Sequence, residues 1–203
     1  ETSPLLTMNR TRTEWDSLTP TERAAKLSAA GAPSLGVEMR VDAEGEVLAR
    51  GSVVMSGYWE QPEETSKAIV DGWFHTGDMA WRDEEGFFYI VDRMKDMIIT
   101  GGENVYPAEV ESAIYGHPQV LEVAVIGVPD AKWGEAVKAV CVPKPGMQVD
   151  VESVMNWARE RIAGFKVPRS VDVIEALPRN ASGKILRKDL RAPYWAGYDR
   201  QVN

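Results

Sequence analysis

Asp78 is the first residue whose type and setting could do chemistry. It follows Thr76-Gly77 where a strand is expected to end. A carboxylate offers acceptor oxygens that suit a pair of neighbouring sugar hydroxyls, and a glycine beside it permits close approach. A turn-forming aspartate is the usual explanation of such a triplet, so the triplet alone is a weak signal.

Lys184 is the second candidate. It ends the loop PRNASGK, in which Gly183 permits unusual backbone angles. A lysine ammonium on its flexible stem can reach two anionic groups and lower the electrostatic barrier between them. The alternative is an ordinary loop lysine in a basic neighbourhood, which consists of Arg179, Arg187, Lys188 and Arg191.

The charged start of the segment Asp92–Glu111, DRMKDMIITGGENVYPAEVE, offers two more candidates. Arg93 can present a rigid, planar set of donors to an anion, and a salt bridge with Asp92 or Asp96 is the alternative. Lys95 has the sequence setting of a solvated surface lysine. The residue types by themselves leave both alternatives open.

The remainder of this segment predicts a hairpin that leads into a helix. Met97–Thr100 is a short apolar run, and Gly101-Gly102 permits a tight turn or the close approach of a ligand. Pro107 suits the first turn of a helix, where its missing N–H costs nothing. Glu109 and Glu111 favour the positive end of the helix dipole. These features would be explained by the fold alone.

The elements expected before this segment are mainly strands. Thr19, Pro20 and Glu22 predict a capped helix that ends at Gly31. Residues alternate in polarity from Val37, and further expected elements are a strand from Val47 towards Tyr58, a helix at Pro62–Val70, a turn at Asp83–Gly86 and a strand at Phe87–Val91. Strands without helical crossovers indicate an antiparallel sheet or a distorted barrel.

After Pro107 the pattern becomes α+β. A helix is expected to end near Gly116, and a helix capped by Asp150 is expected to stop at Gly164. The expected strands are Val120–Val128, Ala136–Val142 and Val171–Ile174. A short helix is expected to follow Lys184 and complete the domain.

Composition excludes several classes of protein. A net charge of −8 without a run of Lys or Arg argues against a nucleic-acid partner. No apolar stretch approaches the roughly 20 residues of a membrane span. The single Cys141 excludes an internal disulfide framework and suits a reducing compartment, so we expect a cytoplasmic protein. His75 and His117 are too isolated for a metal site, and turn or surface roles are expected.

The segment DRMKDMIITGGENVYPAEVE resembles the boundary motif of the AMP-forming acyl-CoA synthetases (fatty-acid–CoA ligases) of the adenylate-forming superfamily. In that family the motif joins a large N-terminal domain to a small mobile C-terminal domain. The resemblance covers essentially the whole chain. It implies that residues 1–94 are a remnant β-barrel-like subdomain of the large domain, and that residues 95–203 are the mobile α+β domain.

The resemblance also implies roles for single residues. Asp78 matches the ribose ligand, Arg93 a ligand of the same nucleotide, and Lys95 the hinge position. Lys184 matches the catalytic lysine, which assists attack of a carboxylate on the α-phosphate of ATP. The expected CoA-binding residues are Gly101, Gly102, Glu103, Trp133, Phe165, Lys166 and Arg169. Glu1 would be the carboxylate that helps to hold Mg²⁺, and a frayed terminal residue is the alternative.

One departure concerns the CoA nucleotide, because Val167 stands where some relatives carry a second basic residue. The implied function is an ATP-dependent carboxylic, in particular fatty, acid–CoA ligase that forms an acyl-adenylate. Its cofactors and partners would be ATP/AMP, Mg²⁺, CoA, the carboxylic acid and the upstream N-terminal part of the same enzyme, without which the chain would be inactive. The alternatives are a peptide-synthetase adenylation domain and a non-catalytic nucleotide-binding or interaction module.

Overall fold

The structure is a computed structural model that describes residues 1–2 and 5–198. The chain divides into two compact units, Glu1–Met94 (the N-terminal unit) and Lys95–Asn203 (the C-terminal unit). No helix within the described residues is both long enough and apolar enough to cross a membrane.

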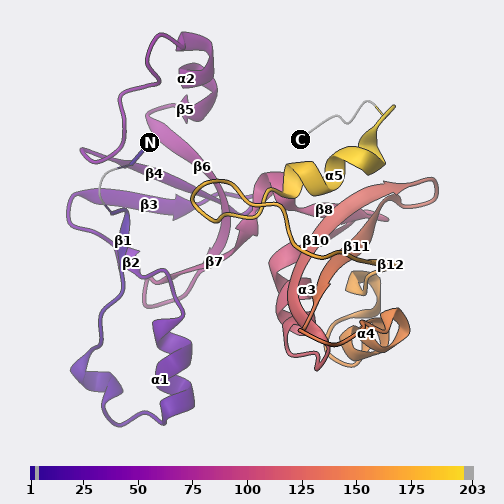
Figure 1. Ribbon diagram of the computed structural model, residues 1–203. Helices are drawn as coiled ribbons and strands as arrows, with labels where there is room; N and C mark the ends of the chain where they lie inside the picture. The colour runs from indigo at the N-terminus through magenta and orange to yellow at the C-terminus, as the bar shows by residue number, and fades with distance from the viewer. Residues whose placement is uncertain (3–4, 199–203) are drawn as a thin grey trace. The chain divides into compact units, whose positions relative to one another are not determined.

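The N-terminal unit is built on an antiparallel five-stranded sheet in the order β3-β4-β6-β5, with β7 paired to β6 (Figure 1). Its strands are β1 Thr7–Met8, β2 Ala32–Pro33, β3 Val37–Val41, β4 Glu46–Gly51, β5 Ile69–Val70, β6 Trp73–Arg82 and β7 Phe88–Arg93. Its helices are η1 Thr13–Trp15, α1 Pro20–Leu27 and α2 Pro62–Ala68. Register shifts interrupt the pairing of β6 with β4 and with β7. Such bulges bend and twist a strand, which is how the sheet curls.

Three predicted boundaries in this unit were wrong. The helix predicted over Pro62–Val70 ends at Ala68, because the β-branched Ile69 and Val70 pair with β6. The strand expected to run towards Tyr58 ends at Gly51. The capping box of Thr19 and Glu22 is present, but α1 ends four residues before Gly31, at Leu27, and none of its residues is buried.

The C-terminal unit contains a second five-stranded sheet in the order β10-β11-β8-β9, in which β12 pairs in parallel with β11. Its strands are β8 Ile98–Thr100, β9 Glu103–Val105, β10 Val120–Asp130, β11 Gly134–Pro143 and β12 Ser170–Val173. Its helices are α3 Pro107–Tyr115, α4 Val151–Arg159, η3 Gly164–Lys166 and α5 Arg187–Trp195, and η2 Met94–Asp96 spans the boundary between the units.

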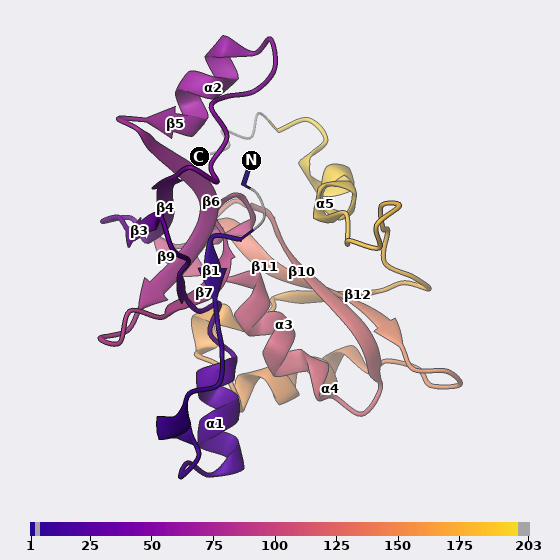
Figure 2. The ribbon, with the colours of Figure 1, turned by 90° about the vertical axis from the view of Figure 1, so that its left-hand side faces the viewer.

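Both faces of this sheet are covered. Alternate residues of β10 point to opposite faces, so Val123 and Val125 join one apolar cluster while Ala124 and Ile126 join another. The first cluster contains residues of α3 and α4, and the second is packed against residues of α5 (Figures 1 and 2). Cys141 of β11 is completely buried in the first cluster. The predicted α+β fold is confirmed.

One further prediction in this unit was wrong, and another was right only in part. Helix α4 begins after its Asp150 cap as predicted but ends at Arg159, and Gly164 begins the 3-10 helix η3 instead of stopping α4. His117 lies in the turn between α3 and β10, which was one of the two expected roles, but it is not a surface residue, because only 1% of it is exposed. Its Nδ1 accepts the N–H of Gln119, so the neutral ring carries its proton on Nε2, which lies 3.1 Å from the Ser153 hydroxyl.

Burial of this imidazole predicts a pH dependence of stability. Burial lowers the pKa of His117, so the fold favours the neutral ring. Its stabilising contribution is therefore complete above the ordinary pKa of about 6.5 and is lost as pH falls through the folded value. We expect the free energy of unfolding to decline below pH 6.5, by at most about 1.4 kcal/mol per pH unit from this group.

Urea unfolding between pH 7.5 and pH 5 measures this decline. The control is His117→Gln, which keeps a polar side chain but does not titrate in this range. We expect the variant to have a lower free energy of unfolding at pH 7.5 than the parent. This free energy should also change less with pH in the variant. Equal slopes in the two proteins would show that His117 is not the group responsible.

Candidate functional site

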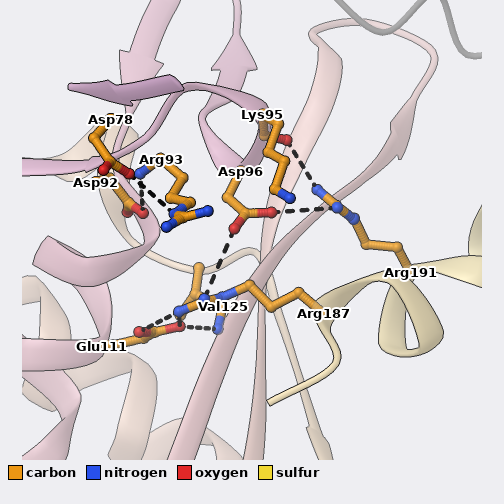
Figure 3. A network of polar contacts seen from close by, with 9 residues as sticks. All are labelled: Asp78, Asp92, Arg93, Lys95, Asp96, Glu111, Val125, Arg187 and Arg191. Atoms are coloured by element: carbon orange, nitrogen blue, oxygen red, sulfur yellow. Dashed lines mark hydrogen bonds and ion pairs between the residues drawn. The ribbon is translucent and has the colours of Figure 1, made fainter. Parts of the chain in front are cut away.

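Asp78 and Arg93 lie opposite each other on neighbouring strands. They are register partners on β6 and β7, and Arg93 Nε lies 3.0 Å from Asp78 Oδ1 (Figure 3). The sequence had suggested Asp92 or Asp96 as the ion-pair partner of Arg93, but the partner is Asp78. The Asp92 carboxylate accepts the backbone N–H of Arg93. Both side chains of the pair are partly exposed, so a carboxylate and a guanidinium stand side by side where solvent reaches them.

The irregular part of β6 just before Asp78 is held by Glu46, a residue that the sequence did not single out. Glu46 is buried at the start of β4, where Oε1 accepts the N–H of Gly77 at 2.8 Å. Its Oε2 lies 2.7 Å from Nδ1 of His75. Gly77 has φ +70°, a left-handed conformation that glycine adopts at little cost. One buried carboxylate thus fixes the backbone on which Asp78 stands.

Removal of this carboxylate should loosen this part of β6. In Glu46→Ala the N–H of Gly77 loses a buried acceptor, and we expect the free energy of unfolding to fall by about 2 kcal/mol. Glu46→Gln retains one acceptor oxygen of the same reach and should lose less than about 1 kcal/mol. Thermal and urea unfolding of both variants measure the difference. Equal losses would indicate that the negative charge matters more than the hydrogen bond to Gly77.

Lys184 stands on a loop whose backbone is closely held. Asn180 Oδ1 accepts the N–H groups of Ser182 and Lys184, and the N–H of Asn180 donates to the Lys184 carbonyl at 3.0 Å. Arg179 bonds both the carbonyl of Gly183 and the carboxylate of Glu122. Gly183 has φ +83°, one of the unusual backbone angles that glycine permits, and it serves a fixed turn.

Lys184 and Lys95 line the same cavity of about 560 Å³ in the C-terminal unit. Neither ammonium group has a hydrogen-bond or ion-pair partner among the described residues. The remaining lining residues are Asp96, Ile185, Leu186, Arg187, Lys188, Arg191, Ala192 and Trp195. Although the chain carries a net charge of −8, this cavity is lined by five cationic residues and one carboxylate. The arrangement favours an anion.

The glycine turn after β8 packs against Trp133. A Cβ atom on Gly101 would lie 2.6 Å from Cε3 of the indole, and the N–H of Gly101 donates to the Trp133 carbonyl. Asp130 Oδ1 accepts the N–H groups of Lys132 and Trp133, and these bonds lower the pKa of Asp130. The guanidinium of Arg169 lies 5.1 Å from the indole centroid. Three of the expected CoA-binding residues are therefore brought together around one fixed ring.

The other expected CoA-binding residues have different surroundings. Gly102 has φ +86° with open space at its Cβ position, and Glu103 is exposed at the start of β9. Lys166 Nζ lies 2.7 Å from both carboxylate oxygens of Glu109, so part of its charge is already balanced. Phe165 beside it is 42% exposed. An exposed ring next to a paired lysine is a weaker phosphate site than two unpaired cations would be.

Glu1 is held at both its backbone and its side chain. Its carbonyl accepts the N–H of Met55, and Oε1 accepts the hydroxyl of Tyr58 at 2.7 Å, a bond that raises the pKa of Tyr58. Ser3 and Pro4, which follow closely, lie outside the described residues. No cluster of three or more His, Cys, Asp or Glu side chains suited to a metal occurs among the residues that the structure describes. A single carboxylate still fits Mg²⁺ that is held mainly by substrate phosphates.

Comparison with known proteins identifies the family. The model of the AMP-binding enzyme C-terminal domain matches residues 109–184. The chain is 48% identical over 178 residues to a feruloyl-CoA synthase of Amycolatopsis sp, covering 83% of this chain and 36% of that protein. It is 52% identical over 146 residues to the long-chain-fatty-acid–CoA ligase of Bacillus subtilis (strain 168), covering 72% of this chain and 26% of that protein.

Solved structures agree with these matches. ATP-bound MatB from Rhodopseudomonas palustris superposes with a TM-score of 0.78 at 41% identity, covering 83% of this chain and 36% of that one. The o-succinylbenzoate CoA synthetase MenE from Bacillus subtilis, in complex with its acyl-adenylate OSB-AMP, gives a TM-score of 0.77 at 38% identity, covering 85% and 37%. The chain thus spans roughly a third of the length of these relatives. It belongs to the adenylate-forming superfamily and corresponds to the C-terminal portion of its AMP-forming acyl- and aryl-CoA ligases.

Proposed function

We propose that this chain supplies the C-terminal part of an ATP-dependent carboxylic acid–CoA ligase that works through an acyl-adenylate. The observation that carries the proposal is Lys184, whose ammonium has no partner among the described residues and stands on a closely held loop. An ammonium that no carboxylate neutralises can stabilise charge that develops on a phosphate.

In the proposed first half-reaction a carboxylate oxygen of the acid attacks the α-phosphorus of ATP. The bond from that phosphorus to the bridging oxygen breaks, and pyrophosphate leaves. Lys184 offsets the repulsion between the two anions and the charge that grows on the α-phosphate oxygens. Asp78 accepts the ribose hydroxyls, and Arg93 donates to the same nucleotide. Glu1 contributes one oxygen to Mg²⁺, which neutralises phosphate charge when it is bound.

In the proposed second half-reaction the sulfur of CoA attacks the acyl carbon of the adenylate. The thioester bond forms while the acyl–oxygen bond breaks, AMP leaves with that electron pair, and the proton of the thiol passes to solvent. Gly101, Gly102 and Glu103 border the path of the pantetheine arm, with Trp133 as its wall, and Phe165, Lys166 and Arg169 receive the CoA nucleotide. A rotation at Lys95 exchanges the Lys184 loop for this face between the two steps.

A fatty acid is the acid that we propose. Support comes from the identity of 52% to the Bacillus subtilis long-chain-fatty-acid–CoA ligase, although relatives named for ferulate and succinylbenzoate match at 48% and 40%. Turnover of palmitate, ferulate and 2-succinylbenzoate by the full gene product that contains this chain measures the preference. A preference for either aromatic acid would replace the fatty-acid assignment.

A carrier protein is a second candidate acceptor. A fatty acid–[acyl-carrier-protein] ligase, ScoC of Streptomyces coeruleorubidus, is 44% identical over 187 residues. The pairing of Lys166 with Glu109 and the buried Val167 also fit an acceptor that lacks the CoA nucleotide. Both acceptors end in the same thiol arm, so thioester yield with CoA and with a phosphopantetheinylated carrier separates them.

The proposed function is tested with a chimeric ligase, in which this chain replaces the matching segment of the Bacillus subtilis enzyme. We expect the chimera to exchange pyrophosphate into ATP in the presence of acid, and to form thioester with CoA. Calorimetric titration of the chain itself with AMP and CoA gives an independent readout. A folded chimera that catalyses neither half-reaction, with a chain that binds neither ligand, would indicate a non-catalytic interaction module.

A further inference from the structure

Asp96 directly follows Lys95 and is a buried carboxylate held by two arginines of helix α5. Only 9% of its side chain is exposed. Arg191 Nη2 lies 3.3 Å from Oδ1, and Arg187 Nη1 lies 3.8 Å from Oδ2 (Figure 3). The other Nη atom of Arg191 donates to the carbonyl of Lys95 at 3.3 Å. Helix α5 therefore holds both the side chain and the backbone of this segment.

Arg187 extends the contact to the body of the C-terminal unit. Its Nη2 lies 2.8 Å from each carboxylate oxygen of Glu111, which belongs to α3. Glu111 Oε1 also accepts the backbone N–H of Val125 in β10. Arg187 thus joins η2, α3 and, through Glu111, the central sheet, although it lies 91 positions after Asp96 in the sequence.

The charges in this cluster balance. Two guanidinium groups face two carboxylates, and the exposed fractions of the four side chains are between 9% and 20%. Ion pairs so removed from water are weakened little by salt, and loss of one partner leaves a poorly solvated charge behind. The cluster therefore acts as a unit.

The far end of α5 is attached independently. Tyr194 donates to Asp172 of β12, which also pairs with the buried Lys138 at 2.6 Å. Burial and the bond to Asp172 raise the pKa of Tyr194 to about 12. The indole N–H of Trp195 donates to the carbonyl of Gly127. Changes at Arg187 or Arg191 should therefore leave α5 attached to the sheet through its last turn.

We propose that Arg187 and Arg191 are positioning residues that fasten the residue after the hinge to the helix that follows Lys184. This inference rests on the proposed function, in which Lys95 is the hinge. Because Asp96 is tied to α5 and α3, rotation is confined to the bonds at and before Lys95. The Lys184 loop then turns as one body with the hinge segment, and the position of its ammonium follows the rotation.

Hydrogen exchange on the 203-residue chain tests this coupling without any need for catalysis. We expect Arg191→Gln to accelerate amide exchange about tenfold in two separate stretches, residues 95–98 and 184–187. The matched control is Lys188→Gln on the same helix, which removes the same charge from an exposed residue without a partner in the described part of the chain. Acceleration in α5 alone, or equal acceleration in the control, would overturn the proposal.

Lysine substitutions distinguish positioning from general stabilisation. Arg191 makes single contacts to two acceptors, which an ammonium can reproduce, so Arg191→Lys should restore protection. Arg187 reaches two carboxylates at once, Glu111 through Nη2 and Asp96 through Nη1, which a single ammonium cannot reproduce, so Arg187→Lys should not. Rescue at both positions or at neither would contradict the proposed geometry. If Arg191→Gln loses its cooperative unfolding transition, the two lysine variants supply the decisive comparison.

The chimeric ligase adds a catalytic readout. We expect Arg191→Gln to lower the rate of adenylate formation about tenfold at unchanged KM for ATP, because Lys184 is misplaced while the nucleotide site is intact. A rise in KM alone would count against a positioning role. If the chimera is inactive whichever residue stands at position 191, the parent arginine included, the proposed function fails. The hydrogen-exchange result still decides whether α5 and the hinge segment are coupled.

Discussion

Lys184→Ala in the chimeric ligase should abolish adenylate formation and spare thioester formation. The proposed role of the ammonium is confined to the first half-reaction, where it offsets the charge on the α-phosphate. Loss of one such group typically costs about 10²–10³-fold in rate. Pyrophosphate exchange measures the first step, and CoA thioester formation from supplied acyl-adenylate measures the second.

Lys188→Ala is the matched control for this prediction. Lys188 lines the same cavity and carries the same charge, and it has no partner among the described residues. If the cavity acted only through its positive potential, both variants would lose similar activity. We expect a loss in Lys184→Ala alone, and an equal reduction of both half-reactions in that variant would refute the assigned role.

Gly101→Ala should impair the second half-reaction and spare the first, which is the reverse of the effect expected for Lys184→Ala. The new methyl group would lie 2.6 Å from the indole of Trp133, so the ring has to move. Because that indole is the proposed wall of the pantetheine path, we expect thioester formation to fall by about 10²-fold, as misplacements near 1 Å do. Adenylate formation should stay within a few-fold of the parent.

Gly102→Ala supplies an unusually close comparison. Both glycines have left-handed φ angles, +61° and +86°, so both substitutions carry a backbone cost of about 1–2 kcal/mol. A Cβ on Gly102 meets nothing within 4 Å, whereas one on Gly101 meets the indole. The difference between the variants therefore isolates the displacement of Trp133. Equal effects on thioester formation would attribute the loss to backbone strain instead.

Local signals in the sequence were sufficient for most of the elements. Thr19 and Glu22 form the predicted capping box, and Asp150 caps α4, because these interactions depend on residues two or three positions away. Alternation also placed Val123 and Val125 in a strand, and the structure shows them on one buried face. The helix ends were less predictable, since tertiary pairing drew Ile69 and Val70 into a strand.

Pairings between distant residues could not be predicted from such signals. Glu109 and Glu111 were interpreted through the helix dipole, yet they bind Lys166 and Arg187, which are 57 and 76 residues away. Glu46 is another example, because nothing in the sequence around a glutamate at a strand start predicts that it is buried against Gly77 and His75. Asp96 was considered only as a partner for Arg93. Only the folded arrangement shows which charge meets which.

Because Cys141 is buried, dyes on introduced cysteines can be used to measure the separation of the two units. It is the single cysteine of the chain, none of it is exposed, and burial raises the pKa of its thiol to about 12. The thiolate is the reactive form, so the native chain should not react with maleimide dyes at neutral pH. Cysteines introduced at the exposed Leu35 and Tyr115, one in each unit, would then be labelled selectively. Single-molecule energy transfer between them would report the separation of the units directly.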